Sequence, residues 1–330
     1  MFRAITRRAA LALPLALALA GAAQAAEKVT FLIDWLPAGD KAVPYLGVKG
    51  GYFAAEGLDV TIQVGRGSSD VVTKLGTGAS DIGTGGLSAL LQAKAESSVP
   101  VTAIASIYTM PPDAIFTTEG SGITSLKDLV GKKIATGTFS SSNVVWPLIL
   151  DANGIKPDEV SLLKVDPGAL APMLASGQVP ATIGWTTTAP GFVGPLAETG
   201  KKISILPWSD FGYKSYGLSL FASDRMIAEK PETVKKFVTA WMKATAAAVA
   251  DPKAAAEALK AMVPEVDVAV AEAQFKASIP LMINDISKAD GMGVFAPKLL
   301  GETWSWVAKA QNLPADKLDP AKAVTGSFLP

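Results

Sequence analysis

A run of alternating strands and helices occurs twice in this chain of 330 residues, about one hundred residues apart. Each copy has the order strand, loop, helix, glycine, strand, loop, helix, glycine, strand. The first copy predicts strands at 29–33, 59–64 and 81–83 and helices at 45–56 and 68–75. The second predicts strands at 132–136, 160–165 and 181–184 and helices at 143–152 and 169–175. Such alternation is typical of parallel sheets covered by helices, so the sequence predicts an α/β fold with two parallel-sheet-based lobes.

The loops after the predicted strands are the expected place for a ligand. In open parallel sheets, ligands bind beyond the carboxyl ends of the strands. If the two lobes face each other, the loops of both line one cleft. These loops are 34–44, 65–69 and 83–88 in the first copy and 137–142, 166–168 and 184–190 in the second.

Two segments, 108–118 and 213–222, have the position and β-like composition expected of crossings between the lobes. They divide the chain into a first lobe at 26–112, a second lobe at 113–216, and a return to the first lobe with C-terminal helices at 217–330. Helical patterns cover 231–250, 253–262 and 266–279, and the first of these places Val234, Phe237, Val238, Trp241 and Val249 on one face. We expect these helices to pack on the first lobe.

The N-terminus has the pattern of a cleavable export signal at residues 1–25. Arg3, Arg7 and Arg8 precede an apolar run at 9–21, and Ala23-Gln24-Ala25 fits a cleavage site. The general export route and the twin-arginine route both fit these residues. No cysteine follows the site, so no lipid anchor is expected, and the predicted location is the periplasm.

Composition excludes several kinds of chemistry. The chain has no cysteine and no histidine, so thiolate nucleophiles, disulfides and histidine bases are excluded. Without the three arginines of the signal, 27 basic and 30 acidic residues remain, and this balance does not favour a nucleic-acid partner. No pair of acids has usable spacing for hydrolysis. We therefore expect no catalytic residues, no metal and no cofactor.

Two segments are the main candidates for ligand contact. Asp34 and Trp35 end the first strand, where an indole face suits a flat ligand and a carboxylate accepts N–H donors. Ser140-Ser141-Ser142 precedes a predicted helix, whose free N–H groups and hydroxyls suit an anion or a carbonyl oxygen. The alternatives are core packing for Trp35 and simple helix capping for the serines.

Further candidates follow from their loops. The glycine-rich run 83–88 permits close backbone approach or is a tight turn, and Arg66 suits a carboxylate or sulfonate or is exposed. Trp185 follows a strand of the second copy, whereas Tyr108 and Tyr216 lie at the crossings. The full set of candidate contacts is Asp34, Trp35, Tyr45, Arg66, Ser68, Ser69, Gly86, Leu87, Ser88, Tyr108, Thr138, Ser140, Ser141, Ser142, Trp185 and Tyr216. Trp304 and Trp306 are expected in packing.

Several motifs in this order resemble a known family. They are the runs 34–37, 50–60, 67–70, 78–83, 126–135 and 174–179, which read DWLP, GGYFAAEGLDV, GSSD, GASDIG, LKDLVGKKIA and LASGQV. Together they are similar to the nitrate/sulfonate/bicarbonate and thiamine-pyrimidine-precursor binding proteins of ABC transporters. The resemblance covers roughly residues 29 to 240.

The resemblance implies a periplasmic-binding-protein fold that closes around a small molecule, and a membrane permease with a cytoplasmic ATPase as partner. A monomer is expected. A flat aromatic or heterocyclic ligand with an anionic or carbonyl group is the first expectation, and an aliphatic sulfonate is the alternative. A periplasmic sensor and a pyrimidine synthase remain rival functions. The synthase consumes a histidine of its own chain, whereas this chain has no histidine. In relatives that bind the thiamine pyrimidine, a histidine-bearing loop follows the position of Trp35, whereas the loop here, 38–42, reads AGDKA, which disfavours a pyrimidine ligand.

Overall fold

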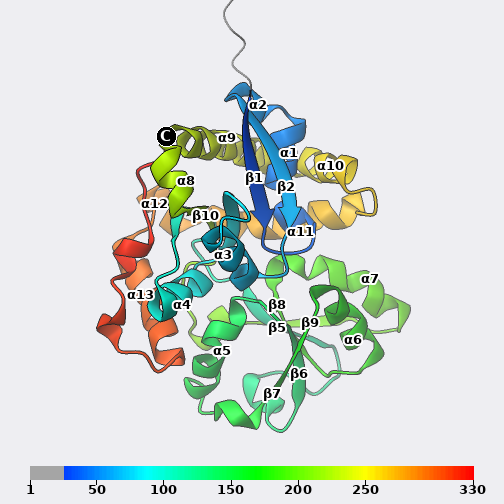
Figure 1. Ribbon diagram of the computed structural model, residues 1–330. Helices are drawn as coiled ribbons and strands as arrows, with labels where there is room; N and C mark the ends of the chain where they lie inside the picture. The colour runs from blue at the N-terminus through cyan, green and yellow to red at the C-terminus, as the bar shows by residue number, and fades with distance from the viewer. Residues whose placement is uncertain (1–25) are drawn as a thin grey trace, which may run out of the picture.

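The protein, described by a computed structural model over residues 26–330, contains two five-stranded sheets (Figure 1). The predicted signal peptide lies outside the described residues. The first sheet has the order β2-β1-β3-β10-β4 and the second the order β7-β6-β8-β5-β9. The strands of the first are β1 (Glu27–Ile33), β2 (Leu58–Val64), β3 (Ile82–Gly86), β4 (Val101–Ser106) and β10 (Leu218–Ser223). Those of the second are β5 (Asp113–Thr118), β6 (Lys133–Gly137), β7 (Ser161–Val165), β8 (Thr182–Trp185) and β9 (Ile203–Pro207).

Both sheets are mixed, and a parallel set of strands forms the basis of each, which confirms the prediction of two parallel-sheet-based lobes. β1 runs parallel to β2 and β3, and β6 runs parallel to β7 and β8. β10 is antiparallel to β3 and β4, and β5 is antiparallel to β8 and β9. β5 and β10 are the strands that arrive from the other lobe. They enter each sheet at the cleft and run away from it, so they oppose strands whose carboxyl ends point to the cleft.

The first lobe carries most of the helices (Figure 1). They are α1 (Ala42–Lys49), α2 (Tyr52–Ala55), α3 (Ser68–Gly76), α4 (Leu87–Ser97), α8 (Asp224–Glu229), α9 (Pro231–Ala250), α10 (Pro252–Met262) and α11 (Val268–Met282). The single helix expected at 45–56 is two helices, because Gly51 adopts a positive φ of 72° between them. Phe237 of α9 stacks on Phe31 of β1, with ring centroids 5.3 Å apart. α9 therefore covers the first sheet, as its apolar face predicts.

The second lobe is smaller, and the C-terminal segment runs beside both lobes. The helices of the second lobe are α5 (Ser142–Asp151), α6 (Leu170–Ser176) and α7 (Pro190–Glu198). The C-terminal segment contains α12 (Asp285–Asp290) and α13 (Pro297–Ala310). Short 3-10 turns occupy Gly39–Lys41, Leu126–Leu129, Pro157–Glu159, Pro167–Ala169, Thr186–Thr188, Trp208–Phe211, Ala315–Lys317 and Pro320–Ala323. No helix within residues 26–330 combines the length and the apolar character needed to cross a membrane.

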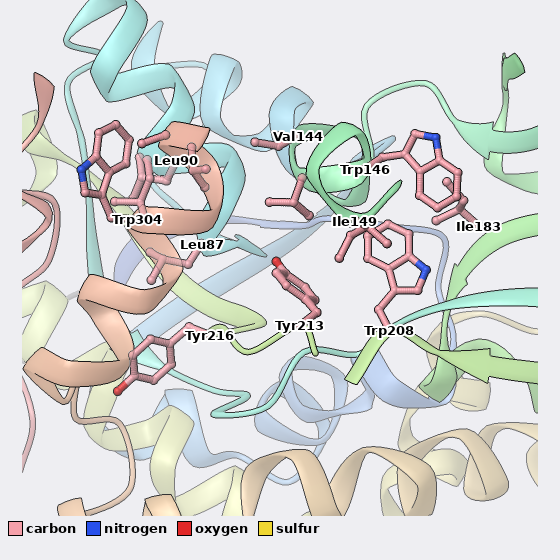
Figure 2. Packing of buried hydrophobic residues seen from close by; sticks show 14 of the residues in the cluster. Leu87, Leu90, Val144, Trp146, Ile149, Ile183, Trp208, Tyr213, Tyr216 and Trp304 are labelled. Carbon is pink, nitrogen blue, oxygen red and sulfur yellow. The ribbon is translucent and has the colours of Figure 1, made fainter. Parts of the chain in front are cut away.

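One apolar core joins the lobes on the crossing side (Figure 2). Trp146 of α5 stacks on Trp208, with centroids 5.4 Å apart, and Tyr213 meets the edge of Trp208. Trp304 of α13 is buried in the same core, and α13 contacts both α4 and α5. The C-terminal segment thus packs on both lobes rather than on the first alone. The lobe boundaries at 112/113 and 216/217 remain predictions, and they fall between strands of different sheets.

Candidate ligand-binding site

A cavity of about 260 Å³ lies between the two lobes, at the carboxyl ends of the parallel strands of both sheets. Its walls are the turns that follow β1, β2, β6, β7 and β8, together with Gln274 of α11. Both lobes contribute, as the strand-end rule predicts. Pockets for drug-sized ligands span roughly 300–1,000 Å³, so this cavity suits a ligand of one or two rings.

Two half-buried tryptophans form aromatic walls on opposite lobes. Trp35 follows β1 directly, and a Cβ on Gly137 of the second lobe would lie 2.4 Å from its ring atom Cη2. Only glycine permits this approach at position 137. Trp185 ends β8, and the edge of Tyr108 supports it from behind, with ring centroids 6.3 Å apart. The cavity therefore offers two indole surfaces to a planar molecule.

A buried charge cluster closes the wall beside Trp185. The Lys41 ammonium lies 2.9 Å from Asp34 Oδ1, 3.6 Å from Asp40 Oδ2 and 4.6 Å from the Trp185 ring centroid. Burial alone lowers the pKa of Lys41, but the two aspartates outweigh burial, and the net pKa is raised. The side chains of all three charged residues are almost fully buried. Lys41, the only cation of this wall among the described residues, is thus already paired with two aspartates.

The charge cluster also links the lobes. Thr187 of the second lobe donates a hydrogen bond of 2.8 Å to Asp40 Oδ2, and Thr84 of β3 donates one of 3.0 Å to Asp34 Oδ1. Truncating one member of such a buried network leaves the others without partners, which is costly. These bonds hold the turn after β1 against the turn after β8.

Neutral polar groups complete the lining. Ser68 begins α3 and Ser140 precedes α5, so the two hydroxyls reach the cavity from different lobes. The Gln274 oxygen accepts the Gly39 N–H at 2.8 Å, so its amide nitrogen is left to donate on the cavity side. Thr188 and Gly191 lie at the start of α7.

Asp113, just behind Trp185, is a buried acid at the first residue of β5. It pairs with Trp185 across the strands and accepts a 2.5 Å hydrogen bond from the Ser142 hydroxyl. Burial raises the pKa of Asp113 to about 6, and the Ser142 bond offsets part of this rise. A carboxyl of this kind titrates close to neutral pH.

Five of the sequence-predicted contacts line the cavity, and they come from both lobes. They are Asp34, Trp35, Ser68, Ser140 and Trp185. Trp35 and the serine run were expected to face one cleft, and Trp35 and Ser140 do share this cavity. Trp35 is half buried, and it also packs against the apolar core of the second lobe, so it combines a place in the lining with a packing role.

Four other candidates lie where the lobes touch, outside the cavity. The Ser69 N–H donates to the Phe139 carbonyl at 3.1 Å, and the Ser88 hydroxyl donates to the Ser141 carbonyl at 3.4 Å. Gly86 is packed so closely on Ser141 that a Cβ would lie 2.3 Å from its Oγ. Gly83 to Gly86 form strand β3 and not the expected loop, and this displaces Gly86 and Ser88 from the lining.

Four more candidates are core residues. Tyr45 is buried where α1 packs on α9 and α10, and burial raises its pKa to about 12. Leu87 and Tyr216 belong to the core that joins the lobes (Figure 2). Tyr216 accepts the Ala296 N–H at 2.6 Å and donates to the Val294 carbonyl. Tyr108 is fully buried behind Trp185 and reaches the cavity only through it.

The last three candidates lie at the rim or behind it. Arg66 is 62% exposed, 3.8 Å from Asp70 and 4.9 Å from the Phe139 ring, so it contacts the second lobe outside the cavity. The Thr138 hydroxyl donates to the Val165 carbonyl at the exposed edge. Ser142 turns inward to Asp113.

Several lining residues are not among the contacts predicted from the sequence. Asp40 and Lys41 lie in the same turn as Asp34, and their opposite charges beside a strand end were an available signal. Phe192 and Gln274 have no such signal, because each looks like an ordinary helical residue and only tertiary packing brings it to the cavity. No cluster of metal-ligating side chains was found among residues 26–330.

Fold and site together define a two-lobed α/β protein with a cavity between its lobes, and the comparisons place the chain in a family. The NMT1/THI5 like family model matches residues 40–255. The chain belongs to this family, which confirms the resemblance seen in its motifs. In structure it is similar to the alkanesulfonate-binding protein SsuA from Xanthomonas axonopodis pv. citri bound to MOPS, with a TM-score of 0.71 and 17% identity. That match covers 90% of this chain and 98% of SsuA, and it supports the periplasmic-binding-protein fold.

Relatives in sequence include both binding proteins and enzymes. The riboflavin-binding protein RibY of Chloroflexus aurantiacus is 26% identical over 313 residues, covering 92% of this chain and 86% of RibY. The 4-amino-5-hydroxymethyl-2-methylpyrimidine phosphate synthase of Candida albicans is 32% identical over 238 residues, covering 69% of each chain. Family membership therefore establishes the architecture but leaves the ligand open.

Proposed function

We propose that this protein is the periplasmic solute-binding component of an ABC importer, which captures a small heterocyclic molecule and delivers it to a permease. The observation that carries the proposal is one cavity built from strand-end turns of both lobes. A ligand there contacts both lobes at once, and only such contacts favour the closed form over an open one. The protein acts as a monomer, with the permease and its ATPase as partners.

The lining favours a flat, uncharged ligand. Two tryptophans and Phe192 offer apolar surface, and the neutral polar groups lie around them. Lys41 is the one cation of the lining within residues 26–330, and it is paired with two aspartates, so this part of the chain presents no unpaired positive charge to an anion in the cavity. This argues for a heterocycle with carbonyl or N–H groups and against the aliphatic sulfonate.

Capture without chemistry fits the residues better than catalysis. The chain has no histidine, and the acids of the lining are held in an ion-pair cluster. The synthases among its relatives make an enzyme the second candidate. Incubation with substrates of that chemistry, followed by mass spectrometry of the protein, would reveal any residue consumed; the proposal predicts an unchanged mass.

The test is to identify the molecule that the protein carries. Protein purified without denaturation is analysed by native mass spectrometry, and the released ligand is identified and titrated back by calorimetry. The proposal predicts one bound organic molecule per chain, with a planar ring and no net charge. A protein that carries and binds no small molecule, across a panel of riboflavin, 4-amino-5-hydroxymethyl-2-methylpyrimidine and MOPS, contradicts it.

A further inference from the structure

Two serine hydroxyls face the cavity from opposite lobes, and their bonds within the protein differ. A serine hydroxyl has one hydrogen to donate and two lone pairs to accept with. Where the hydrogen is already used, the oxygen offers only lone pairs to a ligand. Where a lone pair is used, the hydrogen remains free. The bonds of Ser68 and Ser140 therefore determine what each presents.

Ser140 can act only as an acceptor toward a ligand, because a chain of hydrogen bonds that ends at Asp113 uses its hydroxyl hydrogen. An ionised carboxylate only accepts, so the hydrogen of the 2.5 Å bond between Ser142 and Asp113 comes from Ser142. The Ser142 oxygen then accepts from Ser140, whose Oγ lies 3.1 Å away. Ser140 also accepts the Ser142 N–H at 3.3 Å. One lone pair of Ser140 is left for the cavity, and its hydrogen is not available.

Ser68, in contrast, uses its oxygen as an acceptor within the protein and, over residues 26–330, keeps its hydroxyl hydrogen free to donate. Its oxygen accepts the Gly86 N–H at 2.9 Å, and no hydrogen bond within the described residues uses its hydroxyl hydrogen. Ser68 lies close to the serine turn, since a Cβ on Gly86 would come within 3.5 Å of Ser68 Oγ and 2.3 Å of Ser141 Oγ. A donor from the first lobe and an acceptor from the second thus line the same cavity.

We propose that Ser68 donates to the ligand while Ser140 accepts from it, so that the ligand presents an acceptor atom to the first lobe and an N–H group to the second. Asp113 is the positioning residue that fixes the direction of the chain from Ser140. This inference rests on the proposed function and narrows its ligand class. A sulfonate, whose oxygens only accept, does not match Ser140.

Protonation of Asp113 removes the requirement that Ser142 and Ser140 donate toward the carboxylate. Once neutral, the carboxyl donates to Ser142, the chain can reverse, and Ser140 can donate into the cavity. Tyr213 is the titratable group that faces Asp113, and burial raises its pKa far above neutral. The charged residues of the elements packed around Asp113, namely Asp151, Asp210 and Lys214, are exposed, and no ion pair within residues 26–330 includes Asp113.

The first experiment tests the chain without any ligand. The pKa of Asp113 is followed by carboxyl carbon NMR in the wild type, Ser142→Ala, Ser140→Ala and the control Ser141→Ala. Ser142→Ala removes the donor to the carboxylate and raises the pKa most, Ser140→Ala raises it less, and Ser141→Ala leaves it unchanged. A titration that is insensitive to Ser140 overturns the proposal.

The second experiment tests these two ligand groups with Asp113→Asn, whose amide can donate to Ser142 and reverse the chain. The probes are riboflavin and 4-amino-5-hydroxymethyl-2-methylpyrimidine, which carry an N–H group and an acceptor atom, and MOPS, whose sulfonate has only acceptors. The variant is expected to lower affinity for a bound heterocycle about tenfold and to shift the preference toward MOPS. An unchanged ratio of affinities overturns the proposal. If no probe binds either form, the proposed function fails, and the NMR titration alone decides the role of Asp113.

Discussion

Trp35 shows how a single position can be predicted from the sequence. It directly follows a β-rich run, and a residue at the carboxyl end of a sheet strand lies at the ligand edge whatever the details of packing. Ser68, Ser140 and Trp185 satisfy the same rule and line the same cavity. Tyr45, in a predicted helix, and Tyr216, at a predicted crossing, do not satisfy this rule, and both are buried in the core.

Trp35→Ala is expected to weaken ligand binding by about ten- to one-hundredfold, because a large aromatic surface that covers the ligand is lost. Trp35→Phe should retain part of the affinity. Calorimetry with the co-purified ligand measures both, and circular dichroism checks that melting is unchanged. Equal affinity of wild type and Trp35→Ala would remove Trp35 from the site.

The raised pKa of Asp113 predicts that the stability of the folded protein depends on pH. Its pKa in the folded protein is raised to about 6 from an ordinary value of 3.8, so the folded form binds the proton more tightly than the unfolded form. Its contribution to the free energy of unfolding is therefore greatest below pH 4 and is lost as pH rises through 6.

Asp113→Asn keeps the size of the side chain without the buried charge. It should raise the free energy of unfolding at pH 8 by about 1–3 kcal/mol and change it less at pH 4. Urea denaturation at the two pH values measures this. A variant that is destabilised more at pH 8 than at pH 4 would contradict the sign.

At the scale of elements, most strands and helices could be located from apolar runs and from the glycines that end helices. β2, α9 and α10 lie within two residues of their expected bounds. The run at Gly83–Gly86 was misread, because glycine in a buried strand gives no hydrophobic signal. The direction of β5 and β10 was also missed, since it depends on how the chain crosses between sheets and not on local composition.

The end of β3 controls how closely the lobes approach. A Cβ on Gly86 would lie 2.3 Å from Ser141 Oγ and 2.6 Å from Ser141 Cβ, on the other lobe. Gly86→Ala should hinder closure and weaken binding about tenfold or more, with little effect on thermal unfolding. The matched control is Gly194→Ala in α7, where a Cβ meets nothing within 4 Å. Equal affinities of the two variants would show that this contact does not limit closure.

At the scale of the molecule, two sheets with matching strand orders each receive one strand from the other lobe. The continuous apolar core with α13 joins the lobes (Figure 2), and the cavity between the lobes is lined by other residues, from the turns at the strand ends. The two-lobed plan was predictable because the strand–helix pattern repeats. The place of Gln274 in the lining was not predictable, because only tertiary packing brings α11 to the cavity.

Closure of the two lobes on a ligand is measured most directly as a distance across the cleft. The chain has no cysteine, so a double variant with Arg66→Cys and Lys164→Cys carries only two spin labels. The distance between the two labels is measured across the cleft, near the contact between Arg66 and Phe139. The co-purified ligand should shorten and narrow the distance distribution, and Trp35→Ala at the same ligand concentration should not respond. A distribution that stays unchanged while calorimetry shows saturated binding would contradict capture between the lobes.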